Sequence, residues 1–301
     1  MTYALPIIDP ATSFADYDLI VLNSSAGKDS QVMIDYMIEL ADAQDYPREK
    51  LVVVHADLGR VEWKGTKELA LEQAEHYGLR FEVEHRTQGD LLDHIKERGK
   101  FPDKARRYCT SDHKRAQIGK VLTKLANEIR SADPVTFNRG YTTEIDEEGN
   151  KVRKQKGRPV KILSALGIRA DESPDRSKMA SFSHNKYHTG GFAKQVWNWF
   201  PIFNWTLEQV WDRIKASGVR HHYAYDLGMP RLSCVFCVFA PKKALMIAGR
   251  ENPELLDKYV EVEAEIGHDF RHGFKIATIK EALENDDTEL VGAEDIKNWS
   301  M

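Results

Sequence analysis

The feature that most constrains the fold is a short apolar run that passes through a glycine-containing turn into a helical pattern. Leu19–Asn23 is typical of a buried strand, and Ser30–Ala43 carries its apolar residues on one face of a helix. Further strands are predicted at Leu51–Asp57 and Arg80–His85, with a helix over Glu62–Tyr77 between them. Strands that alternate with helices predict an α/β fold with a doubly wound, mostly parallel sheet. Ligands bind such sheets at the carboxyl ends of the strands, where the turn after the first strand would lie.

Composition places the chain among ordinary globular proteins. It has 301 residues, of which 42% are hydrophobic and 30% are charged. The formal net charge of -4 argues against a nucleic-acid-binding surface over the whole molecule but leaves local basic patches open. No apolar run approaches the ~20 residues of a membrane span, and the N-terminal stretch lacks the basic and apolar regions of a secretory signal. We therefore expect a cytoplasmic protein without a membrane partner.

The turn Ser24–Ser30 does not fit the Walker loop, another phosphate-binding turn between a strand and a helix. Leu22 stands where that loop needs a glycine, and Asp29 stands where it needs a hydroxyl. What remains is the pattern Ser-x-Gly-x-Asp-Ser. Gly27 allows the backbone to approach an anion at the helix N-terminus. The serines and the lysine can bind phosphate oxygens, and Asp29 can hold a Mg²⁺ ion that accompanies them.

This turn resembles the PP-loop of the ATP pyrophosphatase superfamily, which cleaves ATP between the α- and β-phosphates. A glycine-containing turn capped by Ser and Asp is the structural alternative. Further segments resemble proteins like phosphoadenosine phosphosulfate (PAPS) reductase: "VVVHADLG", "RRYCTSDHK", "LGIRADESPDR", and "NWTLEQVWDRIKASG" followed by "YDLGMPRLSCVFC". Because the motifs keep the family's order over residues 19–237, the chain is identified as a member of the PAPS reductase-like branch of this superfamily.

The resemblance implies a site for ATP and Mg²⁺. Lys28, Lys114 and Arg169 would be the cations on the phosphates. With Asp29 as the metal ligand, these are the expected catalytic residues. A typical Lys or Arg is more often a solvated surface charge, and the histidine and aspartate at the end of the second strand could equally be structural. The implied nucleotide-binding residues are Ser24, Ser25, Gly27, Lys28, Asp29, Ser30, His55, Asp57, Gly167 and Arg169.

Departures from the reductases favour a reaction that uses ATP. Thiol-dependent reductases carry a nucleophilic cysteine in a C-terminal Glu-Cys-Gly motif, whereas no cysteine follows Cys237 in this sequence. Assimilatory adenylylsulfate reductases have a Cys-Cys pair where this chain has Tyr108 and Cys109. We therefore expect an adenylyl-transferring enzyme that activates an acceptor for sulfur insertion, as in DNA phosphorothioation or tRNA thiolation. A cysteine desulfurase or another sulfur donor would be its partner. The alternatives are a PAPS or adenylylsulfate reductase and a non-catalytic nucleotide-binding subunit.

The three cysteines do not make a disulfide framework in a chain of this length. Cys109, Cys234 and Cys237 each lie in a family motif, and the resemblance to tRNA thiolases of this superfamily implies that they bind three irons of a [4Fe–4S] cluster. A zinc site completed by a histidine such as His113 and a redox dithiol with a buried Cys109 are the alternatives.

The motifs divide the chain into a nucleotide-binding domain over 1–243 and a helical C-terminal tail over 244–301. The sheet is therefore expected to carry a C-terminal extension that is helical and contains cysteines. Helices are predicted over Asn204–Gly218, with Thr206 as its N-cap, and over Ala244–Gly267. The residues after Gly267 are acidic and weakly patterned.

An insertion interrupts the pattern at about 131–161. It ends in the basic stretch Lys151–Lys161, which could contact a nucleic-acid substrate. The alternative is a solvated loop outside the core sheet that binds no partner.

Overall fold

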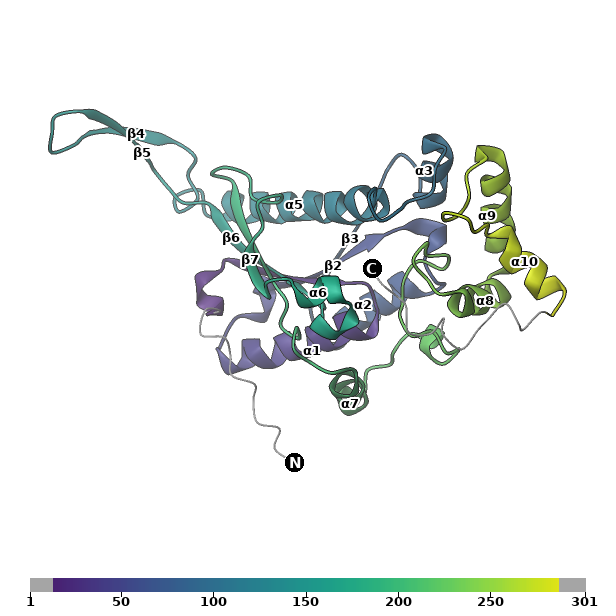
Figure 1. Ribbon diagram of the computed structural model, residues 1–301. Coiled ribbons are helices and arrows are strands. Elements are labelled where there is room, and N and C mark those ends of the chain that lie inside the picture. Colours follow the sequence, from purple (N-terminus) through teal and green to yellow (C-terminus); the bar gives the residue numbers. More distant parts are fainter. Residues whose placement is uncertain (1–12, 287–301) are drawn as a thin grey trace.

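The central sheet confirms the predicted α/β fold. The computed structural model describes residues 13–286 (Figure 1). Six strands lie in the order β3-β2-β1-β6-β8-β7, and all neighbours are parallel except β7 and β8. Their bounds are Leu19–Ser24 for β1, Leu51–Asp57 for β2, Arg80–His85 for β3, Val160–Leu166 for β6, Phe182–His184 for β7 and Lys194–Trp199 for β8.

Helices cover both faces of this sheet because side chains alternate along each strand. Ile20 and Leu22 of β1 pack with α1 and α7 on one face. Leu19 and Val21 pack with α5 on the other face, and Figure 1 shows α5 on the opposite side of the sheet from α1, α2 and α7. These helices are α1 (Lys28–Ala43), α2 (Thr66–His76), α5 (Ala116–Ala132) and α7 (Leu207–Ser217).

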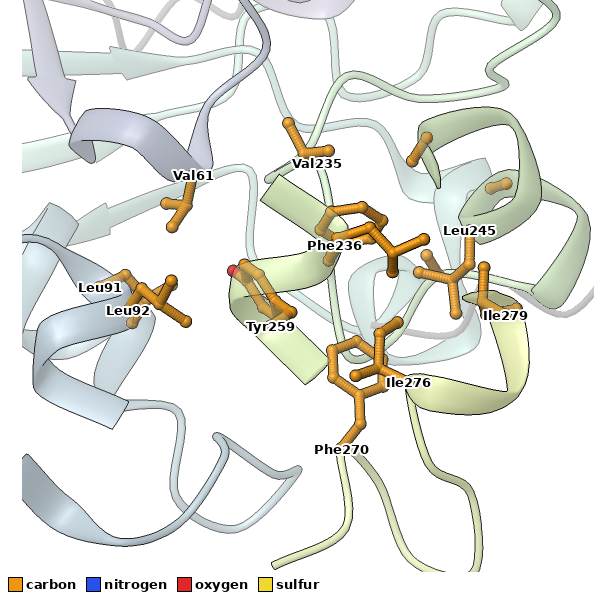
Figure 2. Packing of buried hydrophobic residues seen from close by; sticks show 14 of the residues in the cluster. Val61, Leu91, Leu92, Val235, Phe236, Leu245, Tyr259, Phe270, Ile276 and Ile279 are labelled. Atoms are coloured by element: carbon orange, nitrogen blue, oxygen red, sulfur yellow. The ribbon is translucent and has the colours of Figure 1, made fainter. Parts of the chain in front are cut away.

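A third hydrophobic core lies on the side toward which β3 points (Figure 1). It joins Val61 and Leu91, which follow β2 and β3, to Phe236 and Tyr259 from the C-terminal part (Figure 2). The helical C-terminal part is therefore present and packs against segments of the first half of the chain. The helices of the C-terminal part are α8 (Lys242–Glu251), α9 (Pro253–Ile266) and α10 (Ala277–Glu284). Helix α3 (Leu91–Arg98), from the first half of the chain, packs against α9.

Two strands stand apart from the central sheet. β4 (Tyr141–Ile145) and β5 (Lys151–Gln155) form an antiparallel hairpin, called the arm below, which extends away from the body of the molecule (Figure 1). The arm contains most of the basic stretch that the sequence placed outside the core. Val160 and Lys161 instead begin β6, so the predicted insertion runs two residues too far.

Short helical turns connect the remaining segments. They are η1 (Phe14–Asp16), η2 (Arg48–Lys50), η3 (Gly59–Val61), α4 (Tyr108–Thr110), the π-helical turn η4 (Ser111–Arg115), η5 (Ala170–Glu172), α6 (Pro174–Ser177) and η6 (Tyr223–Tyr225).

The predicted helix over 244–267 is two helices. Asn252 separates α8 from α9, and Pro253 begins α9 because proline lacks the amide that a continuous helix would need there. α10 lies in the segment that the sequence left weakly patterned, and residues 287–301 lie outside the described part. Within residues 13–286, no helix combines the length and the apolar character that crossing a membrane requires.

Candidate nucleotide and cysteine site

The predicted nucleotide-binding residues come together at the carboxyl ends of three adjacent strands. Ser24 ends β1 and pairs with His55 of β2, while Asn23 pairs with Leu166, the last residue of β6. The Ser24–Ser30 turn is therefore flanked by the ends of β2 and β6. This is the edge at which a doubly wound sheet binds ligands.

Hydrogen bonds within the turn fix its shape. Ser24 Oγ accepts from the Ala26 amide at 3.1 Å, and Ser30 Oγ donates to the Gly27 carbonyl at 2.9 Å while accepting from the Ser25 amide at 3.2 Å. These bonds hold Ala26 at φ +55°, a conformation that costs a non-glycine residue about 1–2 kcal/mol. The Ser24 and Ser30 hydroxyls thus shape the loop, whereas Ser25 is exposed at its surface.

Gly167 allows the loop after β6 to touch the first turn of α1. A Cβ atom at this position would lie 2.5 Å from the carbonyl oxygen of Asp29 and 2.7 Å from the amide nitrogen of Ser30. Both are backbone atoms that cannot rotate away, so only glycine fits between the two loops.

A network of charges surrounds Asp29. Its Oδ1 accepts from Arg169 Nε at 2.6 Å, and its Oδ2 accepts from Lys28 Nζ at 3.0 Å. Both cations are 3% exposed, and the Asp29 side chain is 15% exposed. Burial alone would raise the pKa of Asp29, but the charges of Lys28 and Arg169 outweigh it and hold that pKa below its usual range. Asp29 is therefore ionised, and Asp171 neutralises Arg169 from the other side at 2.6 Å.

A second network ties the loop after β6 to the segment that carries two of the cysteines. Arg231 Nη2 lies 2.6 Å from Glu172 Oε1, and Arg176 pairs with the other oxygen of the same carboxylate. Glu172 also accepts from the Arg169 amide at 3.1 Å. Glu172 and Arg231 were not predicted as site residues, although both lie in the quoted motifs.

Tyr225 is a further residue that the sequence did not indicate. Its Oη accepts a 2.9 Å hydrogen bond from the Lys28 amide, at the first turn of α1. Burial raises the pKa of this hydroxyl, so it stays neutral. The Lys28 ammonium lies 5.5 Å from the Tyr225 ring centroid and 3.3 Å from the Pro230 carbonyl. Residues 225–230 therefore form the wall over the turn.

His55 and Asp57 hydrogen-bond to protein groups at the end of β2. The His55 ring is 1% exposed, with Nδ1 3.0 Å from the Ser24 carbonyl and Nε2 3.1 Å from Glu62 Oε2. Burial lowers the pKa of His55, but the hydrogen bond and the charge of Glu62 raise it by more. Asp57 Oδ1 accepts from the Gly59 amide at 2.8 Å. Both groups brace the edge of the sheet beside the turn.

The three cysteines all pack against the third core although Cys109 is far from the others in sequence. Burial raises the pKa of the Cys234 thiol to about 12, the charge of Lys114 opposes this rise, and the charges of Cys237 and Cys109 add to it. Burial likewise raises the pKa of Cys237, and Cys109 and Lys114 act on it too. The charge of Lys114, which lies in the same segment as Cys109, thus acts to lower the pKa of both thiols against the effect of burial.

Three cysteine thiols are a donor set that suits an iron–sulfur cluster and, with a histidine, a zinc site. Within residues 13–286, no group of three or more His, Cys, Asp or Glu side chains is placed to hold one metal ion, and His113 Nε2 already lies 3.0 Å from His94 Nδ1. A cluster does not require the sulfurs to surround one ion, because each thiolate binds its own iron. The buried Tyr259 hydroxyl has no hydrogen-bond partner in the described chain, and the three sulfurs influence its pKa. A hydrogen-bond acceptor bound beside the thiols would satisfy this hydroxyl.

Arg231 connects the two parts of the site. Burial lowers its pKa, and the charges of Glu172, Asp29 and Cys237 counteract that effect. Arg231 follows Pro230, whose carbonyl lies 3.3 Å from the Lys28 ammonium, and it precedes Cys234 by three residues. The segment that carries two of the cysteines therefore begins at the Ser24–Ser30 turn.

The sequence model of the phosphoadenosine phosphosulfate reductase domain matches residues 19–240. An uncharacterized protein of Methanocaldococcus jannaschii is 26% identical over 272 residues, which are 87% of this chain and 54% of that protein. The chain spans about half the length of the curated relatives it matches.

Two solved structures are similar to parts of this chain. Phosphoadenylyl-sulfate (PAPS) reductase from Candida auris, in a phosphate complex, is 12% identical with a TM-score of 0.39 and covers 74% of this chain and 84% of its own. U34-tRNA thiolase NcsA from Methanococcus maripaludis, with its [4Fe–4S] cluster, is 13% identical with a TM-score of 0.39 and covers 89% of this chain and 72% of its own.

Proposed function

Because the chain belongs to the phosphoadenosine phosphosulfate reductase family, we propose that it is an enzyme that transfers the adenylyl group of ATP to an acceptor and so prepares that acceptor for sulfur insertion. An acceptor oxygen attacks the α-phosphorus, and the bond to the β-phosphate breaks. Pyrophosphate leaves with the electron pair, and the acceptor proton passes to water. A sulfur donor such as a cysteine desulfurase would then serve the second half of the reaction.

One observation carries this proposal: two buried cations and a buried carboxylate meet at the first turn of α1. Amides of a first helical turn lack intrahelical acceptors and favour an anion. Lys28 and Arg169 add full positive charges at the same place. Such charges stabilise a departing pyrophosphate, and no protein nucleophile is needed, because positioning and charge neutralisation supply the rate.

Asp29 fits a magnesium ligand. It is held ionised, and each of its oxygens keeps a lone pair beyond the bond to its cation. Mg²⁺ would neutralise phosphate charge there. Lys28 and Arg169 also keep this carboxylate oriented toward the turn.

The cysteines fit a [4Fe–4S] cluster held by Cys109, Cys234 and Cys237. Such a cluster would offer one iron without a protein thiolate, which can bind sulfur. Lys114 and Arg231 place positive charge beside the thiols, and the Tyr259 hydroxyl offers a buried hydrogen-bond donor.

The test is pyrophosphate release from ATP, compared with sulfite release from PAPS and adenylylsulfate in the presence of thioredoxin. We expect Mg²⁺-dependent pyrophosphate release and no sulfite. Sulfite formation would instead identify a reductase, and neither product would identify a non-catalytic nucleotide-binding subunit.

The chain offers a matched pair of variants for this assay. Asp29 and Asp35 both lie on α1, both are 15% exposed and both pair with an arginine. Asp29→Asn should abolish pyrophosphate release, whereas Asp35→Asn, which changes the contact with Arg213, should retain it. Equal activities of the two variants would show that the reaction does not depend on the Ser24–Ser30 turn.

A further inference from the structure

A groove beside α5 contains an unusual buried cation. The groove has a volume of about 550 Å³. Lys194 is 8% exposed, and its ammonium donates to Thr123 Oγ1 at 2.8 Å. No carboxylate in residues 13–286 lies within ion-pair distance of it. A buried charge without a counter-ion is costly unless an anion compensates it. The groove is lined by Ala116, Gly119, Lys120, Thr123, Tyr187, His188 and Lys194.

Other positive charges surround this lysine. Burial lowers the pKa of Lys194, and the charge of Arg139 lowers it further. Burial also lowers the pKa of His188 to about 4, together with the charges of Lys194 and Arg115. The nearest acidic group recorded for the lining is Glu84, 3.9 Å from the Lys120 ammonium. On the side of α5 that faces β3, by contrast, Lys124 is paired with Glu82 at 2.7 Å.

The arm continues this positive surface. Cross-strand partners share a face, so Thr143, Ile145, Lys151 and Arg153 lie on the same face as Tyr141, and none of them is acidic. The guanidinium of Arg153 lies 4.0 Å from the Tyr141 ring centroid. On the other face, Lys154 is neutralised by Glu144 at 3.2 Å.

Aromatic rings join the arm to the groove. Tyr141 makes an edge-to-face contact of 5.6 Å with Phe192, a 47% exposed residue in the segment that also carries His188 and Lys194. Tyr187 is 58% exposed and lies under the guanidinium of Arg115 at 4.2 Å. Alternating cations and accessible rings are the pattern by which proteins hold single-stranded nucleic acid, with cations on phosphates and rings on bases.

We propose that the groove beside α5 and the basic face of the arm bind a single-stranded nucleic acid, with Lys194 and Arg139 on its phosphates. The surface begins at the segment that carries Cys109, because Arg115 ends the turn η4 that directly follows α4. This proposal rests on the proposed function, because it takes the nucleic acid to be the acceptor of the adenylyl group. Because the net charge of the whole chain is -4, the positive surface is confined to this region of the molecule.

The experiment is fluorescence anisotropy of the full chain with a labelled 20-nucleotide single-stranded RNA over a range of salt concentrations. Arg139→Gln, Arg115→Gln and Arg153→Gln should each weaken binding several-fold. Each should also reduce the slope of log K against log salt by about 0.7, the value for one lost phosphate contact on a single strand. Lys124→Gln is the control, since it removes the same charge from α5 at a position paired with Glu82. Its affinity and slope should equal those of the wild type.

Two results would overturn the proposal. One is that the three arginine variants and Lys124→Gln bind RNA equally well. The other is that inorganic phosphate or polyglutamate of equal charge competes as well as unlabelled RNA, which would indicate a general anion site. The variant Lys194→Met removes the buried charge, and its folding is checked by circular dichroism. The arginine variants change exposed residues, so their results do not depend on the folding of Lys194→Met. The assay contains no ATP, so RNA binding without pyrophosphate release would reject only the proposed function.

Discussion

The Asp29 carboxylate lies between two cations that are themselves almost fully buried. From its place at a helix start alone, one would expect an exposed cap, whose loss costs ~1 kcal/mol. The structure changes this expectation, because removal of the carboxylate leaves buried positive charge without its partner. We expect Asp29→Ala to lower the free energy of unfolding by about 3 kcal/mol, measured by urea denaturation at pH 7. A loss no larger than that of Asp35→Ala would contradict this role.

The same residue predicts a pH dependence. The pKa of Asp29 is lowered in the folded state, so its ion pairs contribute fully above the unfolded pKa of about 3.9. The contribution is lost as the pH falls through the lower, folded value. The stability difference between the wild type and Asp29→Ala should therefore be constant from pH 5 to 7 and shrink below about pH 4. A difference that grows on acidification would reject the charge network.

Gly167 gives a second prediction for single residues. Its added Cβ would meet the backbone of α1 at 2.5 Å, and overpacking of this kind costs about 1–3 kcal/mol. Gly167→Ala should therefore lower the melting temperature and weaken ATP binding measured by calorimetry. Gly190→Ala is the control because nothing lies within 4 Å of its Cβ position. Equal effects of the two substitutions would show that the close approach is unimportant.

Motifs identified the turn but not the task of each side chain. The Ser30 hydroxyl was expected on phosphate, yet it bonds to the Gly27 carbonyl. Tyr225 was overlooked because its partner, the Lys28 amide, is 197 positions away. Hydrogen bonds of this kind depend on the assembled fold, and no local pattern in the sequence encodes them.

At the scale of elements, the arm should be dispensable for folding. Its strands lie outside the hydrophobic clusters of the described chain, and its ends are adjacent, since the Lys156 amide donates to the Gly140 carbonyl at 2.9 Å. Replacing residues 141–155 with Asn-Gly, a favoured hairpin turn, should leave the melting temperature nearly unchanged because loop length is thermodynamically tolerated. A loss of more than a few degrees in a thermal melt would assign the arm to the core.

Elements with a local signal were predicted well. β2 and β3 have the expected bounds, and α7 begins after Thr206 and stops at Gly218, as its capping residues indicated. The segment between α9 and α10 lacked such a signal. Its amides at Phe270 and Ile276 donate to the buried Glu263 carboxylate at 2.7 and 2.9 Å, a tertiary contact that stabilises an otherwise irregular stretch.

At the scale of the whole molecule, Cys109 packs against the same third core as the other two cysteines. Protein purified without oxygen should be brown and contain about four irons per chain. Each Cys→Ser change should remove most of the iron, whereas Ser233→Ala, next to Cys234, should not. ATP binding should persist in all four variants because the hydrogen bonds that shape and close the Ser24–Ser30 turn come from residues other than the cysteines and Ser233. Stoichiometric zinc without iron, measured by mass spectrometry, would contradict the cluster.

The wall that Tyr225 forms over the turn has a consequence for biosynthesis. The Lys28 amide and its partner are 197 residues apart, so a ribosome that adds 5–20 residues per second leaves roughly 10–40 s between the emergence of the two groups. During this interval β1 and α1 are present, but the turn lacks the residues that close it. Nascent chains should therefore gain affinity for nucleotide abruptly, once the segment that ends at Cys237 has left the exit tunnel.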